Sequence, residues 1–283
     1  MTAARQARDA ATAAGDVPPP EPLPGPALDS HCHLDLIDRP PADVIADAQA
    51  AGIARLVTIG VDLASSRWAA ACAGQHQGVY AAVAIHPNET AAAAASPAGR
   101  DAVLAELAAL AELPQVRAIG ETGLDYYRDY ASPPVQREWF RAHIEIAKQA
   151  GVALVIHDRE AHDDVFALLD EQGPPDAVVF HCFSGDADMA KRCAEAGYVM
   201  SFAGNLTFKN AQALRDAAAV APPELLLVET DAPFLTPVPH RGKPNRPALA
   251  AYTVRALAAL KQLPVGQMCA QLTATGERVF GRW

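Results

Sequence analysis

The chain has 283 residues, of which 51% are hydrophobic and 20% are charged, and its formal net charge is −10. This composition excludes an intrinsically disordered chain, and the negative charge argues against a protein that coats nucleic acid through a broad basic face. Any contact with DNA is therefore expected to be local, as in an enzyme that holds one strand end.

Neither a membrane span nor an export signal is indicated. No apolar run approaches the ~18 residues that a span requires, and Arg5, Arg8 and Asp9 interrupt the segment where a signal peptide would be apolar. The five cysteines include no CxxC pair, which argues against a disulfide framework and against a thiolate zinc site. We therefore expect a cytoplasmic protein without membrane contact. Its oligomeric state is not indicated.

Residues 1–26 are rich in Ala and Pro, a composition that favours polyproline II and opposes a regular helix. We interpret this segment as a flexible N-terminal extension outside the fold, preceding a single domain over 27–283. The prolines stand at positions 18, 19, 20, 22, 24 and 26.

Eight short runs rich in β-branched residues alternate, from Ala27 onward, with longer stretches of helical composition. This alternation is typical of parallel strands joined by crossovers, and eight units close most naturally into a (β/α)₈ TIM barrel of the α/β class. The predicted strands are 27–33, 54–60, 79–86, 116–123, 152–158, 177–183, 198–204 and 224–231.

Helical stretches occupy the intervals, for example 41–52 and 134–151, and Gly52 and Gly151 stand where helix C-caps are expected. Two further helices are predicted after the last strand, at 246–262 and 264–280. The alternative fold is an open doubly wound sheet, which would carry a Gly-rich phosphate turn after its first strand. That turn reads HCHLDL here, which favours the barrel.

His31 and His33 are two residues apart on the first predicted strand, so both imidazoles project to the same side and Cys32 to the other. By the same alternation Cys182 is expected to face the helices, and Asp29 to share the side of His31. Taken alone, an HxH pair is explained about equally well by ordinary histidines.

The position of further donors favours a metal site. Glu121, His157, His181 and Asp231 end predicted strands four, five, six and eight, and in a barrel these ends converge on one face. Two carboxylates beside four histidines need a charge partner, because desolvation would otherwise be very costly. A pair of divalent cations, Zn²⁺, Mn²⁺ or Mg²⁺, is the simplest partner.

The most economical division of these donors gives His31, His33 and Asp231 to one metal and His157 and His181 to the other. Glu121 then contacts both.

Seven blocks spread over 29–247 resemble the TatD family of metal-dependent deoxyribonucleases, within the wider amidohydrolase-like barrels. The resemblance implies the same six ligands, with an unmodified Glu121 where other members of that superfamily place a lysine modified by CO₂. It also implies 3′→5′ exonuclease action. The blocks are DSHCHLD (29–35), AIHPNE (84–89), AIGETGLDYYR (118–128), VIHDREA (155–161), FHCFSG (180–185), VETDAPFLTP (228–237) and HRGKPNRP (240–247).

Residues near the predicted mouth are candidates for substrate contacts. Aromatic rings suit stacking of an unpaired base, and arginines suit a phosphate. Packing within the rim, salt bridges and solvated surface charge explain these residues nearly as well. Asp125 is interpreted as structural, and Arg241 belongs to a basic cluster with Lys243 and Arg246. The candidates are His86, Tyr126, Tyr127, Arg128, Arg159 and Arg241.

The predicted reaction is hydrolysis of a DNA phosphodiester by a metal-activated water, with Glu121 and Asp231 as catalytic residues and Asp231 as proton acceptor. A single-stranded substrate cut from its 3′ end is expected. One rival is an amidohydrolase-type enzyme acting on another ester, lactone or amide, because one fold serves many substrates. The other is a metal-bearing scaffold without turnover.

Overall fold

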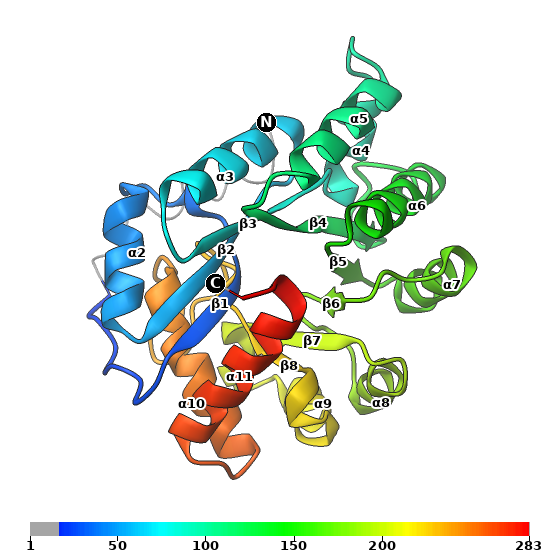
Figure 1. The fold of residues 1–283 in the computed structure, drawn as a ribbon. Coiled ribbons are helices and arrows are strands. Elements are labelled where there is room, and N and C mark those ends of the chain that lie inside the picture. Colours follow the sequence, from blue (N-terminus) through cyan, green and yellow to red (C-terminus); the bar gives the residue numbers. More distant parts are fainter. Residues whose placement is uncertain (1–16, 283) are drawn as a thin grey trace.

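The computed structural model describes residues 17–282, and eight parallel strands form one sheet in the order of the sequence (Figure 1). This confirms the predicted (β/α)₈ barrel. The strands are β1 (Ala27–Cys32), β2 (Ile53–Ile59), β3 (Val79–Val83), β4 (Val116–Asp125), β5 (Ala153–Arg159), β6 (Val178–Phe180), β7 (Val199–Phe202) and β8 (Leu226–Val228).

The barrel closes between β1 and the chain that follows β8. Cys32 and Ala232 form a parallel bridge, and the His33 amide donates to the Ala232 carbonyl at 2.8 Å. The Asp231 amide donates to the His31 carbonyl at 2.9 Å. These bonds join two of the predicted ligand segments directly.

Helices surround the strands as an outer ring (Figure 1). The strands that they cover are buried almost throughout, which explains near-continuous apolar runs such as Leu226–Val228. The helices are α2 (Pro41–Ala50), α3 (Leu63–Gln75), α4 (Thr90–Ala94), α5 (Arg100–Ala111), α6 (Pro133–Ala150), α7 (His162–Gln172), α8 (Ala187–Glu195), α9 (Gln212–Val220), α10 (Ala250–Leu260) and α11 (Val265–Phe280).

Helix α6 shows how local sequence produces this packing. Its apolar residues recur at helical spacing and bury Trp139, Phe140 and Ile144 against the strands. Pro133 begins the helix, where its missing amide hydrogen costs nothing. Gly151 ends it in the left-handed conformation with φ of 64°, as predicted for a C-cap.

Four strands end two or more residues earlier than predicted. β3, β6, β7 and β8 stop at Val83, Phe180, Phe202 and Val228 rather than at residues 86, 183, 204 and 231. In two cases a strand cannot continue to its predicted end, because φ is positive at Cys182 (42°) and at Asp231 (52°), which is incompatible with extended backbone. Several predicted site residues therefore lie on the first turn after a strand.

Residues 17–26 pack on the barrel, so the prediction that all of 1–26 lies outside the fold is wrong for this part. Val17 and Leu23 are buried, and the Leu23 amide donates to the Ala51 carbonyl at 3.0 Å. Arg255 donates to the carbonyls of Glu21 and Pro22 at 2.8 and 3.1 Å. An extended proline-rich segment exposes carbonyl acceptors, and arginines of the barrel bind them. Residues 1–16 lie outside the described residues.

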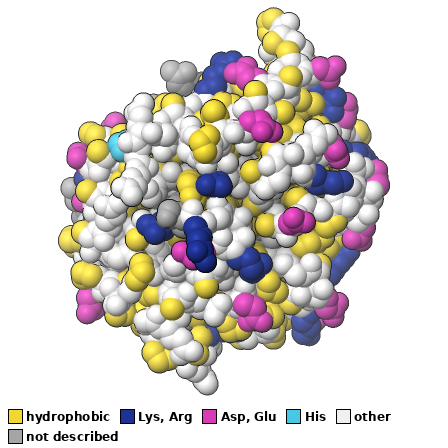
Figure 2. Space-filling view, in the orientation of Figure 1, with side chains coloured by type: hydrophobic (Ala, Val, Ile, Leu, Met, Phe, Trp, Pro, Cys, Tyr) yellow, Lys and Arg dark blue, Asp and Glu magenta, His cyan; other side chains and the backbone are white. Residues whose placement is uncertain are grey.

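The surface drawn in Figure 2 mixes both signs of charge: Lys and Arg side chains gather near its centre, and acidic side chains are scattered around them. It shows no broad basic face, in keeping with the net charge of −10. Within residues 17–282, none of the helices combines the length and the apolar character needed to cross a membrane.

Candidate metal centre

Glu121 lies on β4 at the centre of the predicted ligand cluster, and its two carboxylate oxygens face different histidines. Oε2 is 3.5 Å from His31 Nε2 and 3.9 Å from His33 Nε2. Oε1 is 2.6 Å from His157 Nδ1 and 2.8 Å from His181 Nε2. One carboxylate therefore separates the four histidines into two pairs.

Asp231 belongs to the first pair. Its Oδ1 is 3.4 Å from His33 Nε2 and 3.8 Å from His31 Nε2. The structure thus brings all six predicted ligands together. The groups of donors that lie close enough to hold one ion are His31, His33 and Glu121, then His31, His181 and Glu229, and then His86, Glu121 and His157, so the division between two metals stays a prediction. The imidazoles of His31 and His181 stack with ring centroids 3.8 Å apart, which joins the two halves.

Several observations fit this donor set to metal ions. Both ring nitrogens of the fully buried His31 have no hydrogen-bond partner among the described residues, since the contact with Glu121 is too long for a normal bond. Burial lowers the pKa of His31, which keeps the imidazole neutral, the form that binds metals. Burial opposes ionisation of Glu121, but the charges of His181 and His86 hold its pKa well below the usual range.

Glu229, just past β8, contacts His181 on the side of the ring that faces away from Glu121. The sequence analysis did not identify this residue. Its Oε1 lies 3.0 Å from His181 Nδ1 and accepts the Cys182 amide at 2.8 Å. The side chain is fully buried, and its Oε2 has no partner among the described residues. Because Glu229 accepts the hydrogen bond from His181 Nδ1, the Nε2 atom of the same ring is free to face Glu121. The two-residue spacing between Glu229 and Asp231 was the signal available in the sequence.

Asp125 supports His157 in the same way. Its Oδ2 is 3.3 Å from His157 Nε2 and accepts from Asn88 Nδ2 at 3.0 Å. Burial opposes ionisation, but the contact with His157 and the amide bonds hold the pKa of Asp125 well below its usual range. The predicted structural role of Asp125 therefore includes contact with a predicted ligand.

Asp29 also supports a predicted ligand through hydrogen bonds, as its position two residues before His31 suggested. Its Oδ1 accepts the amides of His31 at 3.2 Å and Thr230 at 2.9 Å, and its Oδ2 accepts the Thr230 hydroxyl. These bonds hold the end of β1 against the chain after β8. Burial raises the pKa of Asp29 to about 8.

His86 lies in the turn after β3, with its Nε2 3.4 Å from Glu121 Oε1. Its Nδ1 accepts the Asn88 amide at 3.0 Å, so in the neutral ring the proton is on Nε2. His86 therefore presents a donor toward the predicted metal ligands, where a substrate oxygen could accept it.

The remaining predicted substrate contacts differ in placement. Tyr127 and Arg128 are exposed, and the Arg159 guanidinium lies 3.9 Å from the centre of the Tyr127 ring. The Tyr126 hydroxyl instead lies 2.7 Å from Asp164 Oδ2 and accepts from Arg137 at 2.9 Å, while its ring packs on the core. Tyr126 is thus engaged away from the cluster.

The basic cluster after β8 is split by the fold. Arg241 stacks on the Phe208 ring at 4.3 Å, whereas Arg246 donates to the Val17 carbonyl and lies 4.0 Å from Asp47. Arg246 therefore binds the N-terminal segment and not, as its place in the predicted basic cluster suggested, a phosphate.

The two cysteines beside ligand histidines also differ. Cys32 is fully buried and donates to the Val57 carbonyl at 3.4 Å, as strand alternation predicts. The prediction for Cys182 is wrong, because β6 has already ended and the residue lies half-buried in a turn, 4.0 Å from the Asn205 amide nitrogen.

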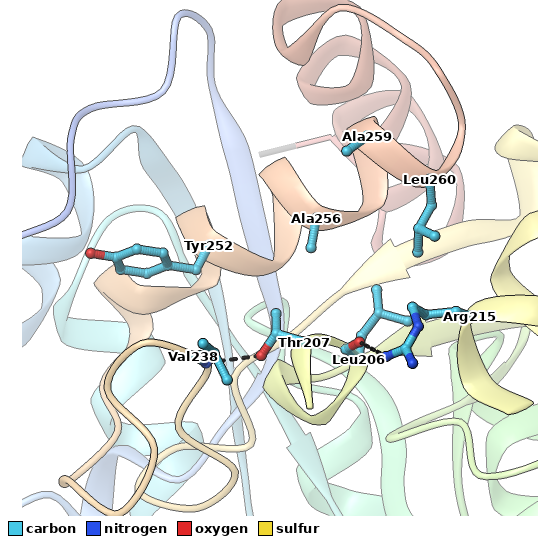
Figure 3. Close-up of a pocket in the computed structure, with 8 residues that line it drawn as sticks. All are labelled: Leu206, Thr207, Arg215, Val238, Tyr252, Ala256, Ala259 and Leu260. Carbon is cyan, nitrogen blue, oxygen red and sulfur yellow. Dashed lines mark hydrogen bonds between the residues drawn. The ribbon is translucent and has the colours of Figure 1, made fainter. Parts of the chain in front are cut away.

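A pocket of about 490 Å³ opens between α9, α10 and the loop after β8 (Figure 3). Its polar groups are already paired: Thr207 accepts the Val238 amide at 2.9 Å, and Arg215 donates to the Phe208 carbonyl at 2.7 Å. None of its lining residues is a predicted ligand. The pocket is therefore separate from the cluster around Glu121.

Comparison with known proteins identifies relatives along nearly the whole chain. The family model described as TatD related DNase matches residues 28–281. The metal-dependent hydrolase TatD of Mycobacterium tuberculosis is 44% identical over 263 residues, covering 90% of this chain and 97% of the relative. The metal-dependent hydrolase YabD of Bacillus subtilis is 35% identical, covering 89% of this chain and 98% of the relative.

Solved structures agree with this assignment. The TatD homologue YjjV of Escherichia coli superimposes with a TM-score of 0.83 at 28% identity, covering 91% of this chain and 98% of that one. A TatD family hydrolase of Entamoeba histolytica, at 17% identity and a TM-score of 0.76, shares the fold. With a matching family model, similar relatives and a buried cluster of metal-binding side chains, the chain belongs to the TatD-related DNase family of metal-dependent hydrolases.

Proposed function

We propose that the chain is a deoxyribonuclease that hydrolyses phosphodiesters with two divalent metal ions, Zn²⁺, Mn²⁺ or Mg²⁺. The observation that carries this proposal is the position of Glu121, whose Oε2 faces His31 and His33 while its Oε1 faces His157 and His181. A carboxylate so placed suits a bridge between two ions.

The ions, when bound, would lower the pKa of a water molecule and polarise the phosphoryl oxygen. Asp231 is the group suited to orient the attacking water and accept its proton. Its side chain is 16% exposed, whereas that of His31 is fully buried, so water can reach it. Its left-handed backbone, with φ of 52°, directs this turn toward His31 and His33.

His86 is suited to donate from Nε2 to a phosphate oxygen, because its Nδ1 is occupied by the Asn88 amide. Such a bond would stabilise negative charge that develops during the displacement. Arg159 and Arg128 can bind neighbouring phosphates, and a local grip of this kind suits a protein of net charge −10.

We further propose 3′→5′ exonuclease action on single-stranded DNA, and a cytoplasmic location in keeping with five free cysteines. The test compares linear single strands with a free or blocked 3′ end, circular single strands and blunt duplex, with a lactone as a non-nucleic substrate. Linear strands with a free 3′ end should be digested fastest and release mononucleotides. Equal rates on circular and linear strands would show endonuclease action, and turnover of the lactone alone would overturn the proposal.

A further inference from the structure

Two exposed tyrosines and two arginines form an alternating array on the loop after β4 and at the end of β5. Arg159 lies 3.9 Å from the centre of the Tyr127 ring, and Arg128 lies 5.7 Å from that ring and 5.9 Å from the Tyr130 ring. Tyr127 and Tyr130 are 56% and 50% exposed. We call these four residues the aromatic–arginine array.

The loop that carries the array is held by a buried side chain of α6. Gln136 is 1% exposed, and its Nε2 donates to the carbonyls of Asp125 and Ala131 at 2.9 Å each. Its Oε1 accepts the Asp125 amide at 2.8 Å. One amide side chain thus ties together both ends of the segment that bears Tyr127, Arg128 and Tyr130, so the rings are presented from a fixed backbone.

The array is also tied to the candidate metal centre. Asp125 Oδ1 accepts the amides of Tyr127 and Arg128 at 3.1 and 3.0 Å, while its Oδ2 lies 3.3 Å from His157 Nε2. Arg159 follows His157 on β5 by two residues. The position of the array relative to the predicted ligands is therefore set by partly buried hydrogen bonds of Asp125.

Half-exposed aromatic rings flanked by guanidinium groups suit a ligand that carries both flat bases and phosphates. Flat bases stack on aromatic faces whatever their sequence, and cations beside the rings can bind the phosphates between the bases. A phosphopeptide would use the arginines and leave the second ring without a partner. The array suits unpaired bases rather than a duplex, whose bases are already stacked.

We propose that the aromatic–arginine array binds consecutive unpaired bases of a single-stranded polynucleotide, with Tyr130 as the outer stacking residue. The inference rests on the proposed function for what happens at the metals, but the binding can be measured without turnover. It adds Tyr130 to the substrate contacts and assigns Gln136 as the residue that positions the loop.

The experiment measures binding of fluorescent oligothymidylate by anisotropy, using the full chain with Asp231→Asn to prevent turnover. Tyr130→Ala should weaken binding about tenfold, in the range known for loss of one stacked base. Tyr130→Phe retains the ring and should bind like the parent. Arg128→Ala should also weaken binding, because it removes the cation between the two rings. Arg67→Ala, which changes an exposed residue of α3 paired with Glu106, is its charge-matched control and should bind like the parent.

An abasic strand of equal length separates stacking from phosphate contact, and it should bind more weakly than oligothymidylate. Equal affinity for the two strands, unchanged binding by Tyr130→Ala at an unaltered melting temperature, or stronger competition by a phosphopeptide would each overturn the inference. If the strand binds as expected but the unsubstituted chain, which retains Asp231, hydrolyses no phosphodiester, the proposed function fails and the inference about the array stands.

Discussion

Glu121 contacts both pairs of histidines, so its loss should affect both halves of the centre at once. Glu121→Ala removes Oε1 and Oε2 together, and we expect metal affinity and the rate to fall by more than the roughly 10- to 100-fold that follows loss of a residue behind a metal ligand. Metal analysis of purified protein and an oligonucleotide assay measure both. Cys32→Ala, on the opposite side of β1, should leave both nearly unchanged.

If Cys32→Ala lost metal as fully as Glu121→Ala, the interpretation of the two sides of β1 would be wrong. The structure already argues against that outcome, because Cys32 Sγ points to the Val57 carbonyl of β2.

Glu229 offers a second prediction at this scale. Glu229→Leu removes the acceptor at His181 Nδ1 and should weaken metal binding about 10- to 100-fold, as is usual when a partner behind a ligand is lost. Glu229→Gln keeps an acceptor oxygen and should bind metal more tightly than Glu229→Leu. Calorimetric titration with Zn²⁺ or Mn²⁺ measures the difference. Equal losses in the two variants would show that the charge matters and the hydrogen bond does not.

At the scale of elements, His143 joins α6 to β4 and to the turn after β3. Its Nε2 accepts the Ile85 amide at 3.3 Å, and its Nδ1 lies 2.7 Å from the Thr122 hydroxyl, next to Glu121. Burial lowers the pKa of His143 to about 3, from the usual 6.5, and the charge of Arg100 adds to the effect. The ring is therefore neutral in the folded protein.

This shift predicts loss of stability in acid. Between about pH 6.5 and 3 the unfolded chain binds a proton that the folded chain does not, so the free energy of unfolding falls as pH decreases. The contribution is at most about 1.4 kcal/mol per pH unit. His143→Gln retains a donor and an acceptor but does not titrate, so denaturant unfolding at pH 7 and pH 5 should show a smaller loss than in the parent. Identical losses would contradict the prediction.

At the scale of the whole molecule, we expect hydrolysis to depend on bound metal and the stability of the fold to depend mainly on the barrel core. Prolonged EDTA treatment should abolish hydrolysis, and added Mg²⁺, Mn²⁺ or Zn²⁺ should restore it, because the proposed nucleophile depends on bound metal. The melting temperature should fall only modestly, since the strands have their own buried core. Full activity in verified metal-free protein would contradict the two-metal proposal.

The sequence alone predicted the architecture and the six donor residues that the structure brings together around Glu121. Alternating strand and helix patterns predicted a barrel, and parallel strand direction brings residues as distant as His31 and Asp231 to one face. Neither inference needs side-chain conformations. The strand ends were less predictable, because a single positive φ, as at Cys182, ends extended structure wherever the packing demands a turn.

Only the tertiary structure decided how these residues are supported. Rotamers and contacts between distant segments determine the hydrogen-bond partners of Glu229, Asp125 and Gln136. They also determine which histidines each Glu121 oxygen faces, and the hydrogen bond between Tyr126 and Asp164. The packing of residues 17–26 on the barrel is of the same kind: composition indicated an extended chain, but arginines far along the sequence supply the hydrogen bonds that hold it. Local pattern carries no information about such pairs, because their energy arises only once the chain is folded.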